Sequence, residues 1–355
     1  MEIQENIPLA PYTTLQVGGP ARFFIETSSD TEILEAHRFA REQRLGFFVL
    51  GGGSNLLVSD EGFPGVVVHL SGGCVASAEE APGNLRIIAD AGVEWDAVVR
   101  MAARRNAAGI ECLSGIPGSV GGTPVQNVGA YGQEVSSTIS KVHAVDLSAE
   151  QVLDMSNEDC WFSYRKSVFN GRRKGRYAIT SVEYVLRLDD APNLAYTDVK
   201  QYFAERGTSR PGLAETADAV RIIRARKGMV LAPDDLDTRS AGSFFKNPVV
   251  PVEILAALAR IANCPVDKVP QYPAGAGYDR TMVKTSAAWL MELAGFKKGF
   301  ASGRAALSTK HVLAITNRGG ATASEIIALR DTVVAGVLEC TGVRLEQEPV
   351  LLGFE

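Results

Sequence analysis

The sequence predicts an α+β protein of two or three domains, in which two small α/β units precede a third unit. Its 355 residues exceed the usual size of one domain. Segments with apolar residues at helical spacing alternate with short apolar runs, which indicates helices between buried strands. Two loops rich in glycine follow such segments. With 46% apolar and 22% charged residues, the chain has the composition of a globular protein and not of a disordered one.

The first unit is expected over residues 1–71. Residues 31–44 carry apolar side chains at helical spacing behind a threonine that can cap a helix. The apolar runs 47–50 and 65–70 predict two buried strands, and the first of them ends directly in the glycine loop Gly51–Asn55. A helix next to short buried strands is typical of a small α/β unit.

The second unit is expected over residues 72–214. Residues 85–90 predict a strand and 94–107 a helix, and the strands 141–147 and 177–188 follow a long glycine-rich stretch. Within the last of these segments, apolar and polar residues alternate as in a strand with one buried face.

The third unit is expected over residues 215–342, as an α+β domain. Helices are predicted at 215–227, 252–262 and 284–294. A fourth helix begins with a capping box made by Thr322 and Glu325 and ends at Gly342. The C-terminal segment 343–355 is expected to form a strand that returns near the active site.

Charge and cysteine usage limit the possible partners. The net charge of −5 argues against general binding of nucleic acid, which needs a basic face. No apolar run approaches the roughly 18 residues of a membrane span, and the first residues lack the pattern of a signal peptide. The five cysteines are scattered and without CxxC spacing, which favours a reducing compartment without disulfides or a zinc site. We therefore expect a cytoplasmic monomer with no membrane partner and no metal.

The segment Leu113–Gly132 holds six glycines and few bulky apolar side chains. Such a stretch is not expected to build a core, so it is either a loose surface loop or a surface against which something large and flat lies. Neither Gly51–Asn55 nor Gly115–Gly122 matches the GxGxxG or P-loop pattern, and either alone could be an ordinary turn. Consecutive glycines also expose backbone N–H groups that bind anions and let a pyrophosphate approach closely. The amides of Gln126 and Asn127 could recognise a ring such as a flavin.

Other common catalytic patterns do not fit the sequence. No serine has the GxSxG context of a hydrolase nucleophile, and the four histidines are isolated, with no HExxH motif. A triad hydrolase and a zinc protease are therefore poor interpretations.

Six motifs occur in order along essentially the whole chain. They are "GGGSNLLVSDEGFPGVVVHL", "AGVEWDAVV", "GIECLSGIPGSVGGTPVQNVGAYGQEV", "SYRKSVF", "AGSFFKNP" and "LEQEPV". Together they resemble the UDP-N-acetylenolpyruvoylglucosamine reductase family, flavoenzymes of bacterial peptidoglycan precursor synthesis. The resemblance implies a vanillyl-alcohol-oxidase-type FAD-binding fold of two α/β subdomains, with a third domain for a nucleotide-sugar substrate.

The same resemblance implies a cofactor and a reaction. FAD is expected to bind non-covalently, NADPH to donate a hydride, and UDP-N-acetylglucosamine enolpyruvate to be reduced to UDP-N-acetylmuramate. The residues expected to contact FAD lie in the two glycine loops: Gly51, Gly52, Gly53, Ser54, Asn55, Gly115, Pro117, Gly118, Ser119, Gly121, Gly122, Gln126, Asn127, Gly129, Ala130 and Tyr131.

Such a reduction needs a cation for the substrate carboxylate and a proton donor. The resemblance assigns these roles to Arg165 and Ser243, and it adds Glu348 as the acid that stabilises the enolic intermediate or positions the donor. The planar fork of an arginine suits a carboxylate, although an arginine at a strand edge is more often a solvated charge. Glu346 is the alternative acid, because the two glutamates are spaced to face one side of a strand.

For the substrate, the resemblance points to Tyr196, Lys227 and Asn247. Lys227 ends a run with Arg221, Arg224 and Arg226, and such a run is usually a solvated helix face. Tyr196 resembles a tyrosine on the substrate loop of one branch of the family. That branch often has a histidine earlier in the chain, so Ser308 and His311 in "LSTKH" depart from its pattern.

Two alternatives stay open. An oxidase of the same FAD fold could act on another small hydroxylated substrate, but such oxidases often attach FAD through His or Cys near the first glycine loop, and Gly51–Asn55 contains neither. A nucleotide-sugar binding module without catalysis is disfavoured by the joint presence of Arg165, Ser243 and Glu348.

Overall fold

The computed structural model describes residues 1–275 and 277–354. By its internal contacts the chain forms two compact units. Unit 1 contains residues 1–7, 21–53 and 64–230, and unit 2 contains residues 8–20, 54–63 and the chain from 231 onward. The finer division into domains at 1–71, 72–214 and 215–342 stays a prediction.

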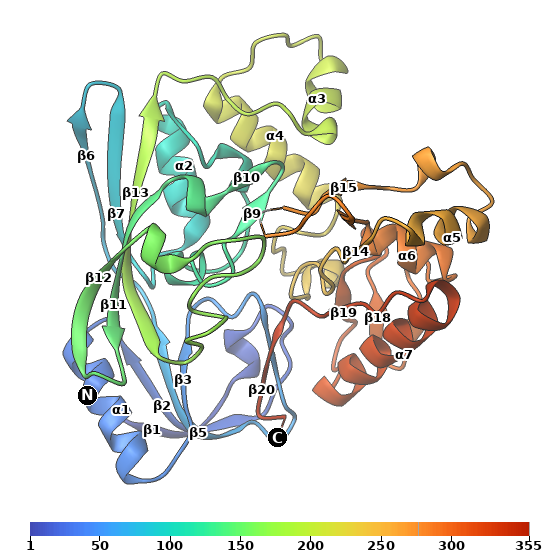
Figure 1. Ribbon diagram of the computed structural model, residues 1–355. Coiled ribbons are helices and arrows are strands. Elements are labelled where there is room, and N and C mark those ends of the chain that lie inside the picture. The colour runs from blue at the N-terminus through green and yellow to red at the C-terminus, as the bar shows by residue number, and fades with distance from the viewer. Residues whose placement is uncertain (276, 355) are drawn as a thin grey trace. The chain divides into compact units, whose positions relative to one another are not determined.

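Unit 1 contains a four-stranded sheet with the order β1-β2-β5-β3. Its strands are β1 (Gln4–Pro8), β2 (Pro20–Thr27), β3 (Phe47–Leu50) and β5 (Phe63–Leu70). Helix α1 (Asp30–Glu42) lies beside this sheet (Figure 1) and is capped by Ser29, whose hydroxyl accepts the N–H of Glu32. Ile33 and Val66 share one buried apolar cluster. The predicted helix and both predicted strands are confirmed, but the predicted threonine cap is wrong, because α1 begins one residue before Thr31 and Ser29 caps it.

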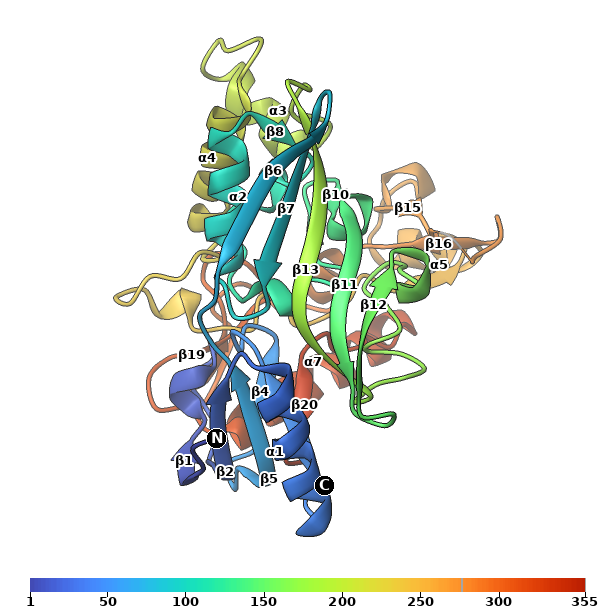
Figure 2. The same ribbon diagram turned by 90° about the vertical axis from the view of Figure 1, so that its left-hand side faces the viewer.

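The larger sheet of unit 1 is antiparallel, with the order β12-β11-β13-β7-β6 and β8 paired to β13. Its strands are β6 (Val75–Ala81), β7 (Asn84–Asp90), β8 (Ala107–Ala108), β11 (Ile139–Asp146), β12 (Gln151–Ser156) and β13 (Tyr177–Leu188). Figure 2 shows these strands as a long twisted sheet, with α2 (Trp95–Arg104) and α4 (Leu213–Arg226) on one side. Val182, Tyr184 and Leu186 are fully buried, which confirms the strand with one buried face.

The glycine-rich stretch is a packed part of unit 1. Leu113 and Val120 are completely buried in the core that covers the larger sheet. The stretch ends in a hairpin of β9 (Gly129–Ala130) and β10 (Gln133–Glu134). The sequence suggested a segment that cannot build a core. That expectation is wrong, because its few apolar side chains all turn inward.

Unit 2 combines short strands with helices. Its strands are β4 (Leu56–Val58), β14 (Val249–Pro251), β15 (Tyr272–Pro273), β16 (Met282–Lys284), β17 (Ala301–Ser302), β18 (Ala305–Leu307), β19 (Ile315–Asn317) and β20 (Val350–Leu352). Its helices are α5 (Ile254–Ile261), α6 (Ala287–Leu293) and α7 (Ala323–Thr341). Helix α7 has the predicted capping box of Thr322 and Glu325 and ends at Gly342, whose φ is 71°. β20 runs parallel to β4.

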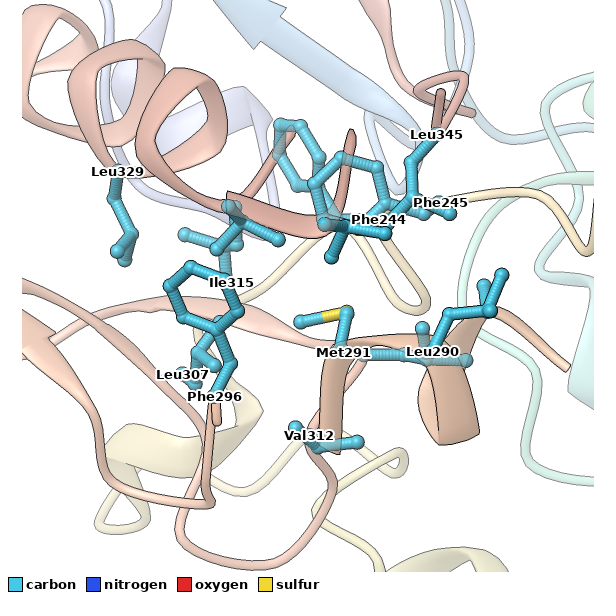
Figure 3. Close-up of a cluster of buried hydrophobic side chains, with 14 of the residues drawn as sticks. Phe244, Phe245, Leu290, Met291, Phe296, Leu307, Val312, Ile315, Leu329 and Leu345 are labelled. Carbon is cyan, nitrogen blue, oxygen red and sulfur yellow. The ribbon is translucent and has the colours of Figure 1, made fainter. Parts of the chain in front are cut away.

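The core of unit 2 surrounds two adjacent phenylalanines. Phe244 and Phe245 are buried together with Leu290, Met291 and Leu345 (Figure 3). The C-terminal strand is shorter than predicted and covers only Val350–Leu352. Pro349 has no N–H to donate to a ladder, and Gln347 before it forms only an isolated bridge with Phe245.

None of the helices in the described part of the chain has both the length and the apolar character needed to cross a bilayer. The remaining helix, α3 (Thr197–Ala204), is short and belongs to unit 1.

Candidate active site

In unit 1 the two glycine loops lie against each other. The N–H of Gly52 donates to the Ser119 hydroxyl at 3.2 Å. A Cβ atom at Gly52 would lie 2.7 Å from the Cα of Gly118, and one at Gly51 would lie 2.6 Å from the Ser119 oxygen. At Gly52 the near atoms are backbone, so the contact between the loops requires glycine there, whereas at Gly51 the Ser119 side chain could rotate away.

The same loops offer a surface that fits a pyrophosphate. Gly122 is exposed, and a Cβ atom there would meet no atom within 4 Å. Within the described residues, the backbone N–H groups of Gly53, Gly118 and Ser119 donate no hydrogen bond. Clustered N–H groups on a surface without side chains attract a phosphate. The loops therefore fit the diphosphate of a dinucleotide such as FAD.

Two buried carboxylates that the sequence analysis missed hold the second loop. Asp96 on α2 accepts the N–H of Gly115 at 2.6 Å and pairs with Arg221. Glu111 is 1% exposed and accepts the N–H of Gly109, the N–H of Asn193 and the side-chain amide of Gln133, each at 2.8 Å. Their signal was an acid inside an otherwise apolar segment, as in "EWDAVV".

Asn127 has a structural role in its loop. Its side-chain amide donates to Glu134 at 2.8 Å and to the Ser163 carbonyl at 3.2 Å, and its oxygen accepts the Ser136 N–H at 3.1 Å. Both amide hydrogens are thus used inside unit 1. The amide oxygen can still accept one further bond, so the predicted contact of Asn127 with the cofactor stays a prediction. The predicted FAD contacts of Pro117, Gln126 and Ala130, which are all half-buried, also stay predictions.

Arg165 lies in a tight turn between Ser163 and Lys166, not at the edge of a long strand. Its φ is 56°, a left-handed conformation that costs free energy and concentrates at functional sites. The guanidinium donates to the carbonyls of Gly129 at 2.8 Å and Asn127 at 3.5 Å. The turn and the glycine-rich loop together fix the position of this cation.

Tyr196 and Lys227 come together around Tyr131. Tyr196 directly precedes α3, and its ring meets that of Tyr131 edge-on, with 5.1 Å between centroids. The Lys227 ammonium lies 5.7 Å from the centroid of the Tyr131 ring and pairs with Asp198 at 2.5 Å. Burial lowers the pKa of Lys227, but the hydrogen bond to Asp198 and the nearby charges of Asp198, Tyr131 and Tyr196 together outweigh it, so the pKa is raised and the ammonium stays charged. Burial likewise raises the pKa of Tyr131.

The arginines before Lys227 do not form a simple solvated face. Arg221 pairs with the buried Asp96, and Arg224 donates to the Met229 carbonyl at 3.0 Å. Burial lowers the pKa of Arg224. The solvated-face interpretation is wrong for these two residues, because α4 turns them toward α2 and toward its own C-terminal turn.

In unit 2, Phe244 links the segments that carry the predicted catalytic residues Ser243 and Glu348. The Phe244 N–H donates to the Leu313 carbonyl at 2.7 Å, and its carbonyl accepts the Glu348 N–H at 2.8 Å. The Ser243 hydroxyl lies 3.4 Å from Nε2 of His311. Asn55 joins the group, since its side-chain amide donates to the Glu348 carbonyl at 3.3 Å.

The structure separates the two candidate glutamates. The Glu346 side chain is 72% exposed and pairs with Lys246 at 2.6 Å, whereas Glu348 is half-buried. The two acids were expected on one face of a strand, but no regular strand forms here. Asn247 accepts the N–H of Ala287 at the start of α6 at 3.0 Å, which fixes its side chain. Its contact with substrate stays a prediction.

Comparisons with known proteins identify the family. Residues 21–156 match the family described as "FAD binding domain", and residues 234–352 match "UDP-N-acetylenolpyruvoylglucosamine reductase, C-terminal domain". A UDP-N-acetylenolpyruvoylglucosamine reductase from Thermobifida fusca is 44% identical over 352 residues, which cover 98% of this chain and 97% of the relative. The chain belongs to the UDP-N-acetylenolpyruvoylglucosamine reductase family.

Other members of this reductase family agree with the assignment. The Streptomyces coelicolor reductase is 44% identical over 98% of this chain and 90% of its own length. The crystal structure of the reductase from Thermus caldophilus superposes with a TM-score of 0.61 at 27% identity, covering 99% of this chain and 98% of that one. The family resemblance and the α+β fold with an FAD-binding domain, both expected from the sequence, are confirmed.

The two matched segments divide the predicted site residues of this family member. The FAD-binding match includes both glycine loops, and the reductase-specific match includes Ser243, Asn247 and Glu348. Arg165, Tyr196 and Lys227 lie between the two matches.

Proposed function

We propose that this protein reduces UDP-N-acetylglucosamine enolpyruvate to UDP-N-acetylmuramate with FAD and NADPH, a step of peptidoglycan precursor synthesis. The observation that carries the proposal is the backbone placement of Ser243 and Glu348: Ser243 directly precedes Phe244, and the Phe244 carbonyl accepts the N–H of Glu348 at 2.8 Å. Protonation of a carbanion requires a positioned proton donor, and this segment supplies a hydroxyl and a half-buried carboxyl as candidates. We further propose that the protein works in the cytoplasm as a monomer.

The glycine loops hold the cofactor. The N–H groups of Gly53, Gly118 and Ser119 bind its pyrophosphate, and the bare backbone at Gly122 lets that group approach. The chemistry that FAD supplies when bound is transfer of a hydride, taken from NADPH, to the terminal vinyl carbon of the substrate.

Arg165 and Glu348 stabilise the charge that follows. The substrate carbon next to the carboxylate gains carbanion character, and its charge spreads onto the carboxylate oxygens. A guanidinium held by the carbonyls of Gly129 and Asn127 is a fixed cation for those oxygens. A carboxyl near an enolate stabilises it when it is protonated or hydrogen-bonded, and we assign this role to Glu348.

Ser243 donates the proton. Ser243 is half-buried and directly precedes two core phenylalanines, so its backbone position is fixed. A serine is a weak acid, and it serves as a donor only to a strongly basic carbon or with help from a neighbouring group. The bond from hydroxyl to proton breaks as the new C–H bond forms.

Lys227, Tyr196 and Asn247 hold the nucleotide-sugar. The charged ammonium of Lys227 suits a diphosphate, and the half-exposed ring of Tyr196 offers an apolar face. Asn247 adds an amide held by α6.

Anaerobic half-reactions test the proposed function. The FAD-loaded protein is first reduced by NADPH and then mixed with UDP-N-acetylglucosamine enolpyruvate. The flavin spectrum should bleach in the first step and return in the second, with UDP-N-acetylmuramate as product. UDP-N-acetylglucosamine without the enolpyruvyl group is the control and should leave the flavin reduced. Failure of the enolpyruvyl compound to restore the flavin spectrum would contradict the proposal.

A further inference from the structure

His311 is placed by a tight turn of unit 2. The Ser308 side chain is completely buried, and its hydroxyl accepts the N–H groups of Lys310 at 3.0 Å and His311 at 3.2 Å. The Ser308 N–H donates to the Ala314 carbonyl, and the Ala314 N–H donates to the His311 carbonyl. These bonds close the turn 308–314 on itself.

Side chains outside the turn hold it as well. Buried Asp237 accepts the N–H of Thr309 at 2.8 Å and its hydroxyl at 2.5 Å, and it pairs with Arg318 at 2.8 Å. Lys310 pairs with Asp235. Burial raises the pKa of Asp237, but the bonds from Thr309 and Ser308 and the charge of Arg318 together outweigh it and the pKa is lowered, so this anchor stays ionised. The backbone of His311 therefore has little freedom to move.

Ser243 is fixed by the same turn. The Phe244 N–H donates to the carbonyl of Leu313, two residues after His311. This bond brings the chain at residue 243 close to the turn that carries residue 311. The Ser243 oxygen lies 3.4 Å from Nε2 of the His311 imidazole. The pairing of hydroxyl and imidazole is thus a consequence of the backbone arrangement and not of two freely moving side chains.

We infer that His311 is a positioning residue for Ser243, with its Nε2–H donating a hydrogen bond to the serine oxygen. The inference rests on the proposed function, in which Ser243 is the proton donor. An oxygen that accepts this bond has its own hydrogen directed elsewhere, toward an acceptor such as the substrate carbon. The sequence pattern "LSTKH" had singled out this residue without giving it a role.

The proton balance defines what His311 contributes. When the Ser243 proton moves to the substrate carbon, the electron pair of the carbanion becomes the new C–H bond. The electrons of the broken O–H bond stay on the serine oxygen as an alkoxide. A hydrogen bond from Nε2–H stabilises this charge, since bonds to charged groups are stronger than neutral ones. Water then returns a proton to the oxygen.

The kinetic test combines variants of both residues. His311→Leu removes the donor and should slow flavin reoxidation by the enolpyruvyl substrate about 10- to 100-fold, with reduction by NADPH unchanged. His311→Gln keeps an N–H donor and should retain most of the rate. In a Ser243→Ala background, His311→Leu should cause no further loss. An equal loss in both backgrounds would mean that His311 does not act through Ser243.

A spectroscopic test does not depend on turnover or folding of the leucine variant. The chain has four histidines, so ¹⁵N-histidine labelling gives few signals, and His311→Gln assigns that of His311. We expect Nε2 to carry a proton whose resonance shifts in Ser243→Ala. An unprotonated Nε2, or a signal unchanged by Ser243→Ala, would overturn the inference. If Ser243→Ala instead reoxidises normally while the shift is present, the proton-donor role fails and the hydrogen bond stands.

Discussion

The glycine loops of unit 1 and the Ser243 segment of unit 2 differ in which groups they offer to a ligand. The loops work through backbone: Gly52 contacts Gly118 directly, and Gly53 and Ser119 present N–H groups. The Ser243 segment works through side chains, each held by backbone bonds made by a neighbouring residue. Phe244 supplies those bonds and also fills the core.

The difference predicts how each region responds to substitution. A side chain added to a loop changes the available space, so it should affect cofactor content or stability. A side chain shortened at residue 243 leaves the backbone in place, so it should affect only chemistry. This distinction between the two regions would fail if a loop substitution altered only one half-reaction, or if a change at Ser243 altered cofactor content.

The largest effect is expected for Ser243→Ala. The variant removes one hydroxyl and almost no volume, so folding, FAD content and substrate affinity should remain. Reoxidation of the flavin by the enolpyruvyl substrate should slow by about two to four orders of magnitude, because a positioned acid contributes that much. Rapid mixing measures this rate directly.

Ser243→Cys is the matched variant for this experiment. A thiol is a stronger acid of similar reach and should restore part of the lost rate. Near wild-type reoxidation in Ser243→Ala would show that Ser243 is structural. A water bound to Glu348 is then the next candidate for the donor.

Gly122→Val and Gly121→Val test whether each glycine leaves room for the cofactor or for a neighbouring part of the protein. A Cβ atom at Gly122 meets nothing within 4 Å, so this variant should fold normally and lose flavin. At Gly121 a Cβ atom would lie 2.6 Å from that of Ala91, so the variant should lose about 1–3 kcal/mol of stability. Flavin absorbance and thermal unfolding of the apoproteins distinguish the two. Normal flavin content in Gly122→Val would count against the loop assignment.

Lys227→Ala should weaken substrate binding roughly tenfold, the loss of about 1.4 kcal/mol from one charge-assisted contact. Reduction of the flavin by NADPH should be almost unchanged, because the lysine is assigned to the nucleotide-sugar. Titration of substrate and single-turnover reduction measure the two quantities. Equal loss in both would remove the proposed division between loops and substrate residues.

The smallest effect is expected for Asp198→Asn, and it has the opposite sign. Asp198 pairs with Lys227, and both side chains are 37% exposed. Such a pair contributes about 0.2–1 kcal/mol, so releasing the lysine should tighten substrate binding up to about fivefold. Unchanged or weaker binding would mean that Asp198 orients Lys227 instead of competing for it.

Much of the local structure followed from the sequence. Helix α1, the capping box of α7 and the buried strands β3 and β13 depend on neighbours within one or two turns or on simple alternation. These patterns are local, so the sequence carries them in full. The six ordered motifs likewise gave the family, the cofactor and the reaction.

The structure alone decided which polar groups meet. The amide of Asn127 donates its hydrogens within unit 1. Glu346 is exposed while Glu348 is half-buried, and the His311 ring lies beside the Ser243 hydroxyl. The structure also showed Asp96 and Glu111 as buried anchors. The acids inside apolar segments gave a local signal for the burial of Asp96 and Glu111, but not for their partners. The partners that matter most are distant in the chain, such as residue 221 for Asp96 and residue 311 for Ser243. A side chain's spacing tells which face it occupies, but only the packed chain determines what lies opposite that face.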